Sequence, residues 1–419
     1  MKPSITFFLD SRREKLNGKY PIKLNVFASK PQRLRKLYPI GFDMSEVEFN
    51  ETWKTKKPKR EFQSLRIQLD AILSRANEVA SNLDPFTLES FEKKFLRQSG
   101  EGILLDYQYD QIIKELNSRN QIGNASNYDL SRKSLISFLD EKYPKKNFKR
   151  LTFHEINSNW LKDYEFFMVN EKKRSHTTVS FYLRALRTIF NRAIEEGEIE
   201  KELYPFGKRK YQVPATKKVK KALSQAELQI LFNAAPKNKE QEKAKDFWFF
   251  SYGCNGMNIK DIAQLQFKDI KEGKIEFFRA KTITTSKGSL KPIEVYLNDF
   301  SKSIIEKYGN ESKNPDNYVF EIINNNQSPQ EQRTKIQNFT RFVNQHIKKL
   351  CGLNDISTDI STYWARHSFA TVSIRKGASL EFIQESLGHE NLKTTQGYFA
   401  GFDQDNKKEF AKSIMDFNN

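Results

Sequence analysis

The chain has 419 residues, enough for two to four domains, and 71 Lys and Arg against 52 Asp and Glu give a formal net charge of +19. A basic excess of this size predicts a polyanionic partner, and nucleic acid is the first candidate because the sequence carries no lipid-anchor signal. Cys254 and Cys351 offer neither a zinc-site spacing nor a disulfide framework. Since no apolar window is long enough to span a membrane and Met1–Arg12 lack the apolar core of a secretory signal, we expect a cytoplasmic protein.

Residues 1–100 predict a small α+β domain. Three short runs rich in β-branched and aromatic residues predict a three-stranded sheet: Ser4–Leu9, Tyr20–Phe27 and Leu34–Ile40. A basic loop is expected over Thr52–Arg60, followed by a helix over Glu61–Asn82 with its leucines on one face. The basic surface suits DNA binding, and the alternative is the solvated surface of a generic α+β domain.

Residues 101–205 predict an all-helical domain. Four amphipathic segments begin near Asn, Ser or Thr residues: Leu104–Asn117, Asn127–Tyr143, Trp160–Asn170 and Thr177–Glu196. The last segment is the clearest, because its apolar residues form one stripe and Arg184, Arg187 and Arg192 lie elsewhere. These arginines say little on their own, since most exposed helix faces carry Lys and Arg.

Residues 206–221 form a basic segment punctuated by Gly and Pro, which makes them the clearest domain boundary in the chain. Two domains that clamp a duplex need a linker that crosses the DNA backbone. Phosphates there would be neutralised by Lys208, Arg209, Lys210, Lys217, Lys218, Lys220 and Lys221. Composition alone also allows a nuclear-localisation signal.

Residues 222–419 predict a mainly α domain with a small antiparallel sheet. Its first part is expected to hold two helices and then two paired strands, at Asp246–Gly253, Ile259–Leu265, Lys274–Ala280 and Pro292–Leu297. Lys281 falls where the first strand gives way to the T-T-S-K-G-S turn.

Three short helices in tandem are expected near the C-terminus. The first covers about Trp364–Lys376, the second is N-capped by Ser379 and ended by Gly388, and the third begins near Leu392 and carries Tyr398. Their seams hold three polar side chains that the spacing can bring together around one phosphate: Arg366, His389 and Tyr398. Taken singly, each residue is better explained by an ordinary structural role: Arg366 as a surface arginine, His389 as a loop histidine and Tyr398 as a core aromatic residue.

The combination is more specific than its parts. A-R-H-S-F-A-T, then L-G-H, then T-T-Q-x-Y nine residues past the histidine resembles the C-terminal signature of the tyrosine recombinases, the phage integrase family. Y-x-A-R-H-S-F-A-T and G-M-x-x-x-D-I-A are similar to integrases of Bacteroides-type conjugative transposons and prophages.

This resemblance implies an organisation and partners. The organisation is an arm-type DNA-binding domain at 1–100, a SAM-like core-binding domain at 101–205, a linker at 206–221 and a catalytic domain at 222–419. The implied partners are double-stranded DNA with core and arm sites, other copies of the chain in a tetramer on DNA, and accessory DNA-bending and directionality factors.

The resemblance also assigns roles to four residues. Tyr398 would attack the phosphodiester and form a 3′-phosphotyrosyl enzyme, and Arg366 would hold phosphate oxygens with its charged fork. Lys281, in a local R-x-K-T pattern, would be the general acid for the 5′ oxygen, and His389 would hydrogen-bond the phosphate or assist proton movement. Neither a cofactor nor a metal is expected, because no metal-ligand or phosphate-cradling glycine motif is evident.

One departure from the family pattern concerns its first arginine, which falls in G-x-R-x-x-E/D. Here Asn258 stands at the arginine position, while Asp261 keeps the acidic supporting position. Asn258 is also well explained as an ordinary helix N-cap. A neutral amide cannot replace a guanidinium charge, and losing such a donor slows a reaction about 10²–10³-fold. We therefore expect Arg279 or Lys260 to supply the charge.

A second departure is Tyr363, which stands where most relatives have the histidine of H-x-x-R. A phenol can donate to a phosphate oxygen but is a poor base near neutral pH. The C-terminal segment Lys408–Phe417 is expected to form a helix that docks on a neighbouring protomer, with packing on its own domain as an almost equal alternative.

The sequence therefore predicts a site-specific recombinase or integrase that integrates or excises a mobile element. The alternative of a different class is a catalytically impaired accessory or regulatory DNA-binding protein, which Asn258 supports and the retained site residues oppose. A type IB topoisomerase shares the chemistry, but the N-terminal domain and the T-T-Q-x-Y form favour recombination.

Overall fold

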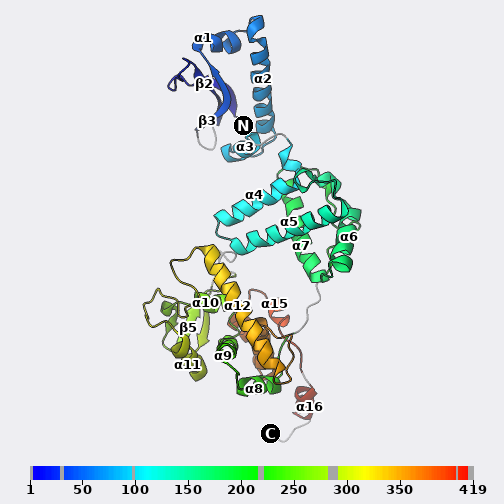
Figure 1. Ribbon diagram of the computed structural model, residues 1–419, viewed down its shortest axis with the longest axis vertical. Coiled ribbons are helices and arrows are strands. Elements are labelled where there is room, and N and C mark those ends of the chain that lie inside the picture. The colour runs from blue at the N-terminus through cyan, green and yellow to red at the C-terminus, as the bar shows by residue number, and fades with distance from the viewer. Residues whose placement is uncertain are drawn as a thin grey trace. The chain divides into compact units, whose positions relative to one another are not determined.

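The computed structural model describes residues 3–28, 33–96, 100–215, 221–281, 291–402 and 404–413. Figure 1 shows the helices and strands coloured by residue number from the N-terminus to the C-terminus. The chain divides into two compact units. The first unit comprises residues 1–108, 147–155 and 191–203, and the second comprises residues 109–146, 156–190 and 204–419. Helices α4 (Leu105–Ser118) and α7 (His176–Glu195) cross this division.

The first unit is built on a three-stranded antiparallel sheet in the order β1-β2-β3. β1 (Ser4–Leu9), β2 (Tyr20–Ala28) and β3 (Leu34–Met44) confirm the predicted strands. Along β2 every second side chain from Ile22 is buried, as the two-residue period of a strand requires. This buried face packs with the helices that follow the sheet into one hydrophobic core.

Those helices are α1 (Glu46–Phe49), a π-helix (Asn50–Lys54), α2 (Arg60–Ser81), α3 (Leu88–Phe95) and a 3₁₀ turn (Glu101–Ile103). α2 confirms the predicted helix, but the predicted loop over Thr52–Arg60 is wrong at its start. A capping box at Ser45 opens a helix that continues to Lys54. The Arg66 guanidinium lies 4.3 Å from the Trp53 ring and donates to carbonyl oxygens at that helix's end.

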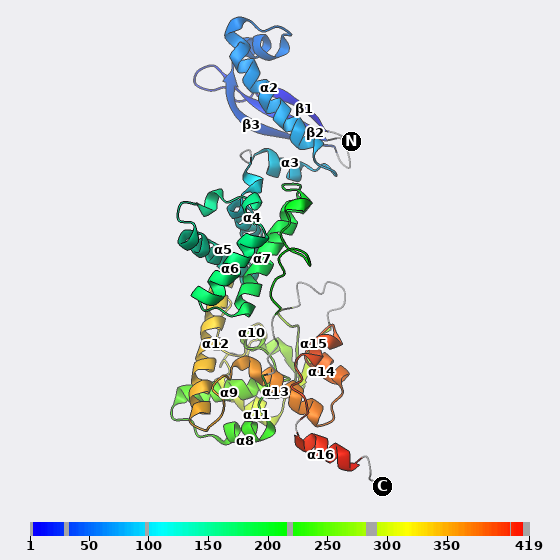
Figure 2. The same cartoon turned by 90° about the vertical axis from the view of Figure 1, so that its right-hand side faces the viewer.

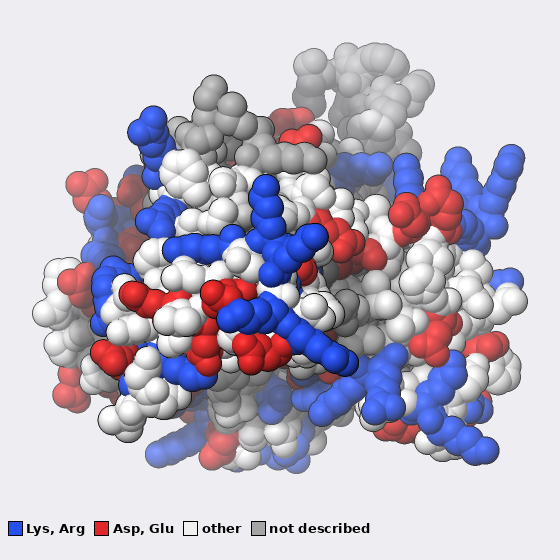
Figure 3. All heavy atoms as spheres, turned by 90° about the horizontal axis from the view of Figure 1, so that it is seen from above, with Lys and Arg blue, Asp and Glu red and all other residues white. Residues whose placement is uncertain are grey.

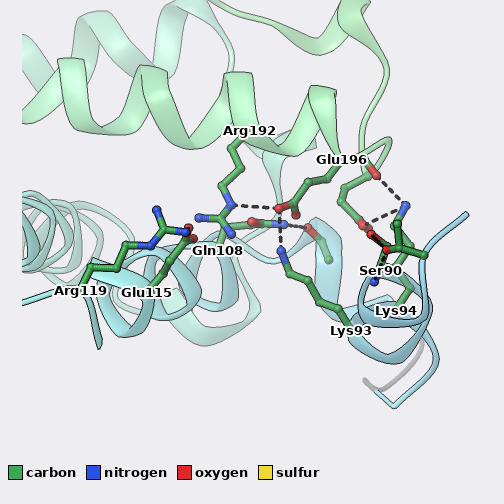
Figure 4. Close-up of polar contacts among 11 residues, drawn as sticks. Ser90, Lys93, Lys94, Gln108, Glu115, Arg119, Arg192 and Glu196 are labelled. Atoms are coloured by element: carbon green, nitrogen blue, oxygen red, sulfur yellow. Dashed lines mark hydrogen bonds and ion pairs between the residues drawn. The ribbon is translucent and has the colours of Figure 1, made fainter. Parts of the chain in front are cut away.

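An ion-pair cluster joins α3 to the C-terminal end of α7 within the first unit. Glu196 accepts from Lys93 Nζ at 2.7 Å and from Arg192 Nε at 3.0 Å, and its carbonyl oxygen accepts from Lys94 Nζ at 2.6 Å. Figure 4 shows the Lys93 and Arg192 side chains converging on the Glu196 carboxylate. Because three donors share one residue, the cluster fixes the end of α7 against α3.

The second unit begins with a helical bundle formed by parts of α4 and α7 with α5 (Ile122–Lys142), α6 (Ser158–Phe166) and a π-helix (Phe167–Glu171). α5 begins at Ile122 rather than at the predicted Asn127. Aromatic rings fill the bundle: the Phe138 ring centroid lies 5.0 Å from that of Trp160 and 5.2 Å from that of Phe167. The predicted all-helical region is confirmed.

The rest of the second unit is a mainly helical body around α9 (Lys239–Gly253), as Figure 2 shows. α9 packs against α11 (Asp299–Tyr308), α12 (Pro329–Gly352) and α13 (Thr362–Arg375). Its aromatic residues are buried in the largest hydrophobic core of the described chain. α8 (Gln225–Asn233) and α10 (Ile259–Gln264) flank α9 in sequence, and α8 opens with a capping box from Ser224.

A second small sheet has the order β4-β5-β6 and is antiparallel throughout. Its strands are β4 (Ile270–Lys271), β5 (Lys274–Phe277) and β6 (Ile293–Tyr296). The predicted pairing of two strands is confirmed, while most of the turn predicted between them lies outside the described residues. Short 3₁₀ turns lie at Phe148–Arg150, Phe153–Glu155, Lys201–Leu203 and Phe267–Asp269.

The C-terminal helices are α13, α14 (Leu380–Ser386), α15 (Leu392–Gln396) and α16 (Gln404–Ser413). Ser379 caps α14 by accepting from the backbone of Phe382, as predicted. Tyr398 was expected on the third helix, but it lies just after α15. The helix ends at Gln396 because the chain turns at Gly397 to return to α13.

None of the helices in the described ranges combines the length and apolar character needed to cross a membrane. Charged side chains of both signs are intermixed on the face that Figure 3 shows. The net positive charge is therefore not gathered into one uniform patch on that face.

Candidate active site

The centre of the site is Arg366 on α13, a residue only 3% exposed. Nη1 donates to the carbonyl oxygen of Gly256 at 3.0 Å, and Nη2 donates to that of Leu387 at 2.5 Å. Gly256 has φ +66°, and a Cβ there would lie 2.7 Å from the Arg366 Cα, so only glycine allows this approach. Burial and then the charge of Arg279 lower the pKa of Arg366 to about 10, which leaves it charged near neutral pH.

His389 lies just after α14 and meets the same guanidinium. Its Nε2 is 3.2 Å from Arg366 Nη2, and its Nδ1 is 3.0 Å from Thr395 Oγ1. Because an arginine can only donate, Nε2 is the acceptor and the ring proton is on Nδ1. Burial and then the charges of Arg366, Arg279 and Lys281 lower the pKa of His389 to about 3. The imidazole is therefore neutral at physiological pH.

The L-G-H turn explains how His389 reaches Arg366. Gly388 has φ +60°, which turns the chain back immediately after α14. A Cβ at Gly388 would lie 2.4 Å from the Ile293 Cδ1 on β6, so the sheet packs directly on this glycine. The histidine is thereby fixed between α13 and the turn before α15.

Tyr398 completes the predicted trio. Its side chain is 8% exposed, and the Arg366 Cζ lies 5.5 Å from its ring centroid. The His389 ring centroid is 4.9 Å away, at a tilt of 35°. The structure therefore brings Arg366, His389 and Tyr398 together, as the sequence predicted.

Tyr363, in the first turn of α13, touches the Tyr398 hydroxyl directly through a hydrogen bond between the two phenols. Burial and the hydrogen bond to Tyr398 raise the pKa of Tyr363. Burial opposes ionisation of Tyr398, but the hydrogen bond from Tyr363 and the charges of Arg366 and Arg279 outweigh it and lower the pKa of Tyr398. The two phenols thus have pKa values shifted in opposite directions.

Asn258 stands at the N-cap position of α10, yet its side chain caps no backbone group. It donates instead from Nδ2 to Asp261 Oδ2 at 3.3 Å. Asp261 Oδ1 accepts from the backbone of Ala280 at 3.0 Å, so this buried carboxylate ties α10 to the segment after β5. That segment carries Arg279 and Lys281.

Arg279 and Lys260 were the candidates for the charge missing at Asn258. Arg279 is 8% exposed, and its positive charge acts on Arg366, His389, Tyr363 and Tyr398. Lys260 lines the same pocket as Arg279, but it is exposed and is not among the principal causes of those four pKa shifts. Position and burial therefore favour Arg279.

A pocket of about 590 Å³ lies beside this cluster. Its lining includes Lys281 and Arg279, Tyr363, and the pair formed by Asn258 and Asp261. Lys281 is exposed at the edge of the described segment. Among the described residues, no group of three His, Cys, Asp or Glu side chains is arranged to hold a metal ion.

The basic segment is only partly described, because Lys217, Lys218 and Lys220 lie outside the described residues. Lys208, Arg209 and Lys210 are exposed, and Lys221 is half-buried. The first half of the segment is anchored: Phe206 and Tyr211 are buried, and the Tyr211 hydroxyl donates to Glu165 at 2.6 Å.

Three residues of the cluster were not singled out from the sequence. His367 stacks on Tyr398 with ring centroids 4.6 Å apart, and its Nδ1 is 3.2 Å from the Tyr398 carbonyl oxygen. Thr371 Oγ1 donates to the same oxygen at 3.3 Å, and Thr395 orients His389. The sequence signal was present, since all three residues lie in two of the motifs that carried the resemblance, A-R-H-S-F-A-T and T-T-Q-x-Y.

Two family models match the chain. The phage integrase SAM-like domain matches residues 104–213, and the phage integrase family matches residues 221–405. The chain belongs to the phage integrase family. It is thus a tyrosine-type site-specific recombinase, an enzyme that breaks and rejoins DNA strands.

Curated relatives agree with this assignment. A tyrosine recombinase of Thermosipho africanus is 27% identical over 277 residues, which are 63% of this chain and 88% of the relative. Tyrosine recombinase XerD of Oceanobacillus iheyensis is 25% identical over 284 residues, which are 64% and 84% of the two chains.

Solved structures share the fold. A lambda integrase (75–356) dimer bound to a core site matches with a TM-score of 0.51 and 18% identity, covering 72% of this chain and 98% of that one. The Tn1549 transposon integrase in complex with circular intermediate DNA matches with a TM-score of 0.50 and 16% identity, covering 73% and 97%.

Proposed function

We propose that this recombinase cuts and rejoins double-stranded DNA through a 3′-phosphotyrosyl intermediate on Tyr398. The observation that carries the proposal is the buried cluster in which a guanidinium, a neutral imidazole and a phenol converge. The Arg366 hydrogen-bond partners named above are two carbonyl oxygens and a neutral histidine, so no anion neutralises it directly. A phosphodiester supplies the missing negative charge.

In the proposed reaction, Tyr398 Oη bonds to phosphorus as the bond from phosphorus to the 5′ oxygen breaks. Lys281 gives a proton to the departing 5′ oxygen, and the Tyr398 proton passes to water. Arg366 stabilises the charge that develops on the non-bridging oxygens, and its Nε, which has no hydrogen-bond partner in the described chain, is one donor for them.

We infer that His389 acts as a neutral hydrogen-bonding group rather than as a cation. Its proton on Nδ1 is committed to Thr395, and its Nε2 accepts from Arg366. It therefore orients the guanidinium toward the phosphate. Arg279 supplies the second positive charge in place of Asn258, while Asp261 holds the segment that carries it.

The domain scheme inferred from the sequence remains part of the proposal. Residues 1–100 would bind arm sites, 101–205 and 222–419 would bind core sites, and 206–221 would cross the DNA backbone. The DNA-bound state of the Tn1549 and lambda integrases supports a duplex DNA partner. An origin in a Bacteroides-type conjugative transposon or prophage rests on the G-M-x-x-x-D-I-A and Y-x-A-R-H-S-F-A-T motifs alone.

We propose a tetramer on DNA, with host or element factors that bend the duplex and set the direction. The C-terminal helix α16 presents an exposed Phe410, which suits docking on a neighbouring protomer. Ile414 and Phe417 of the predicted apolar face lie outside the described residues. Deleting the residues beyond Phe402 should abolish assembly of synaptic complexes in gel-shift assays, and unchanged assembly would contradict the docking role.

The central test is covalent trapping on a nicked suicide substrate that carries the element's end. The full chain should form an adduct that survives a denaturing gel without added metal, and Tyr398→Phe should form none. Tyr296→Phe, which removes a hydroxyl from an exposed tyrosine on β6, is the matched control and should behave like the parent. Tight binding without an adduct on several candidate ends would instead support a regulatory DNA-binding protein.

A further inference from the structure

Three residues on one face of α13 contact Tyr398, from its hydroxyl to its carbonyl oxygen. Tyr363, His367 and Thr371 are spaced four residues apart, so they project from the same side of the helix. Tyr363 contacts the Tyr398 hydroxyl, His367 stacks on its ring, and both His367 and Thr371 bind its carbonyl oxygen. Of these three residues, only Tyr363 reaches the oxygen that attacks phosphorus.

The orientation of Tyr363 is fixed by packing. Its ring meets His367 edge to face with centroids 4.9 Å apart, and its centroid lies 5.8 Å from that of Tyr398. Its side chain is 45% exposed and lines the pocket beside the cluster, whereas Tyr398 is almost fully buried. The hydroxyl of Tyr363 is thus held between the solvent-accessible pocket and the nucleophile.

Electrostatics decide which phenol loses its proton. The ionisable groups next to the pair are Arg366 and His367 on α13 and His389 after α14. The pocket that Tyr363 lines adds Arg279, Lys281, Lys260, Arg333 and Asp261. The positive charge of Arg366 lies against the Tyr398 ring. The negative charge is therefore best placed on Tyr398, with Tyr363 keeping its proton.

We propose that Tyr363 activates the nucleophile: its hydroxyl donates a hydrogen bond to Tyr398 Oη and stabilises the phenolate form that attacks phosphorus. This role rests on the proposed function of Tyr398 and goes beyond contact with a phosphate oxygen. Tyr363 accepts no proton in the step; the Tyr398 proton leaves to water through the adjoining pocket. In the rejoining step the same hydrogen bond stabilises Tyr398 as the leaving group, so both directions benefit.

The first test needs no DNA. The full chain is labelled with [¹³Cζ]tyrosine, and the Tyr398 resonance is identified by its absence in Tyr398→Phe. In Tyr363→Phe, the pKa of Tyr398 should rise by about one to two units, because a hydrogen bond to the charged form is lost. Tyr296→Phe should leave that pKa unchanged. An unchanged Tyr398 pKa in Tyr363→Phe would overturn the proposal.

The second test is the pH profile of cleavage on the suicide substrate. Tyr363→Phe should reduce single-turnover cleavage about 10–100-fold near neutral pH, and the deficit should shrink as pH rises and Tyr398 ionises unaided. A deficit that stays constant across pH would mean that Tyr363 only binds phosphate or supports the fold. The ring is retained in this variant, so its packing on His367 is preserved and an unchanged melting temperature is expected.

The two experiments separate this inference from the function it rests on. If the parent forms no adduct, the proposed function fails, while the resonance titration still reports whether the phenol pair exists. If the adduct forms but the Tyr398 pKa does not respond to Tyr363→Phe, the recombinase mechanism stands and the activating role of Tyr363 falls.

Discussion

Two buried charges, one in each compact unit, have opposite surroundings. Asp10, just after β1, is fully buried, and its two carboxylate oxygens accept from Arg12 Nε at 2.8 Å and Lys23 Nζ at 2.6 Å. Arg366 is buried almost as completely, but its hydrogen-bond partners are neutral and Arg279 adds a second positive charge nearby. Asp10 is hydrogen-bonded to opposite charges, whereas the hydrogen-bond partners of Arg366 are neutral groups.

The difference separates structural charges from functional ones. Burying an ion is costly unless an opposite charge and hydrogen bonds compensate it. Arg12 and Lys23, which belong to the same unit, provide this compensation for Asp10, and their hydrogen bonds lower its pKa. Arg366 has no carboxylate as a hydrogen-bond partner and feels the charge of Asp261 only from a distance, so under the proposed function an entering phosphate completes its compensation.

The largest expected effect on cleavage comes from removing the charge of Arg366. Arg366→Ala should lower single-turnover cleavage about 10³-fold, because the principal donor to the phosphate oxygens is lost. Arg341→Ala removes an exposed arginine on α12 and serves as the matched control. Near-normal cleavage by Arg366→Ala on the suicide substrate would show that the buried guanidinium is structural, like Asp10.

The second effect concerns the charge beside Arg366. Arg279→Ala should abolish cleavage or lower it about 10²–10³-fold while leaving DNA binding intact. Lys260→Ala should reduce cleavage much less, because Lys260 is exposed and its charge is not among the principal causes of the pKa shifts in the cluster. Binding is measured by gel shift and cleavage by adduct formation; full cleavage by Arg279→Ala would eliminate Arg279 as the substitute for the missing arginine.

A smaller effect is expected from His389, whose pKa is lowered to about 3. Since the group is neutral above that value, the parent's cleavage rate should show no histidine titration between pH 5 and pH 8. His389→Gln keeps a hydrogen-bonding side chain and should reduce cleavage about 10-fold, equally across that range. A step near pH 6.5 that disappears in His389→Gln would show a protonated histidine in the reaction.

The smallest effect on catalysis is expected at Asp10, where stability changes instead. Its folded-state pKa is lowered, so its contribution is present above the unfolded pKa of about 3.9 and is lost as pH falls further. Asp10→Asn should speed hydrogen exchange of the β1–β2 amides at pH 7 and leave cleavage of core substrates unchanged. Protection equal to the parent's at pH 7 would contradict the compensation argument.

Much of this architecture is readable from local pattern. The strands at Ser4–Leu9 and Tyr20–Ala28 follow from β-branched and aromatic runs between turns, and α2 follows from its apolar face. The predictions that were wrong concern segments whose conformation is set by contacts with residues distant in sequence. Thr52–Lys54 is helical because Arg66 binds the end of that turn, and Tyr398 lies beyond α15 because the chain must return to α13.

The sequence by itself determined the family, the trio of Arg366, His389 and Tyr398, and the absence of an arginine at position 258, because these depend on residue types at fixed spacing. Only the tertiary structure distinguishes Arg279, which is buried, from Lys260, which is exposed, since burial does not follow from local spacing. It also decided the pairing of Tyr363 with Tyr398. The Tyr363 and Tyr398 hydroxyls are 35 residues apart in sequence. They meet because the chain after α15 packs back on the first turn of α13.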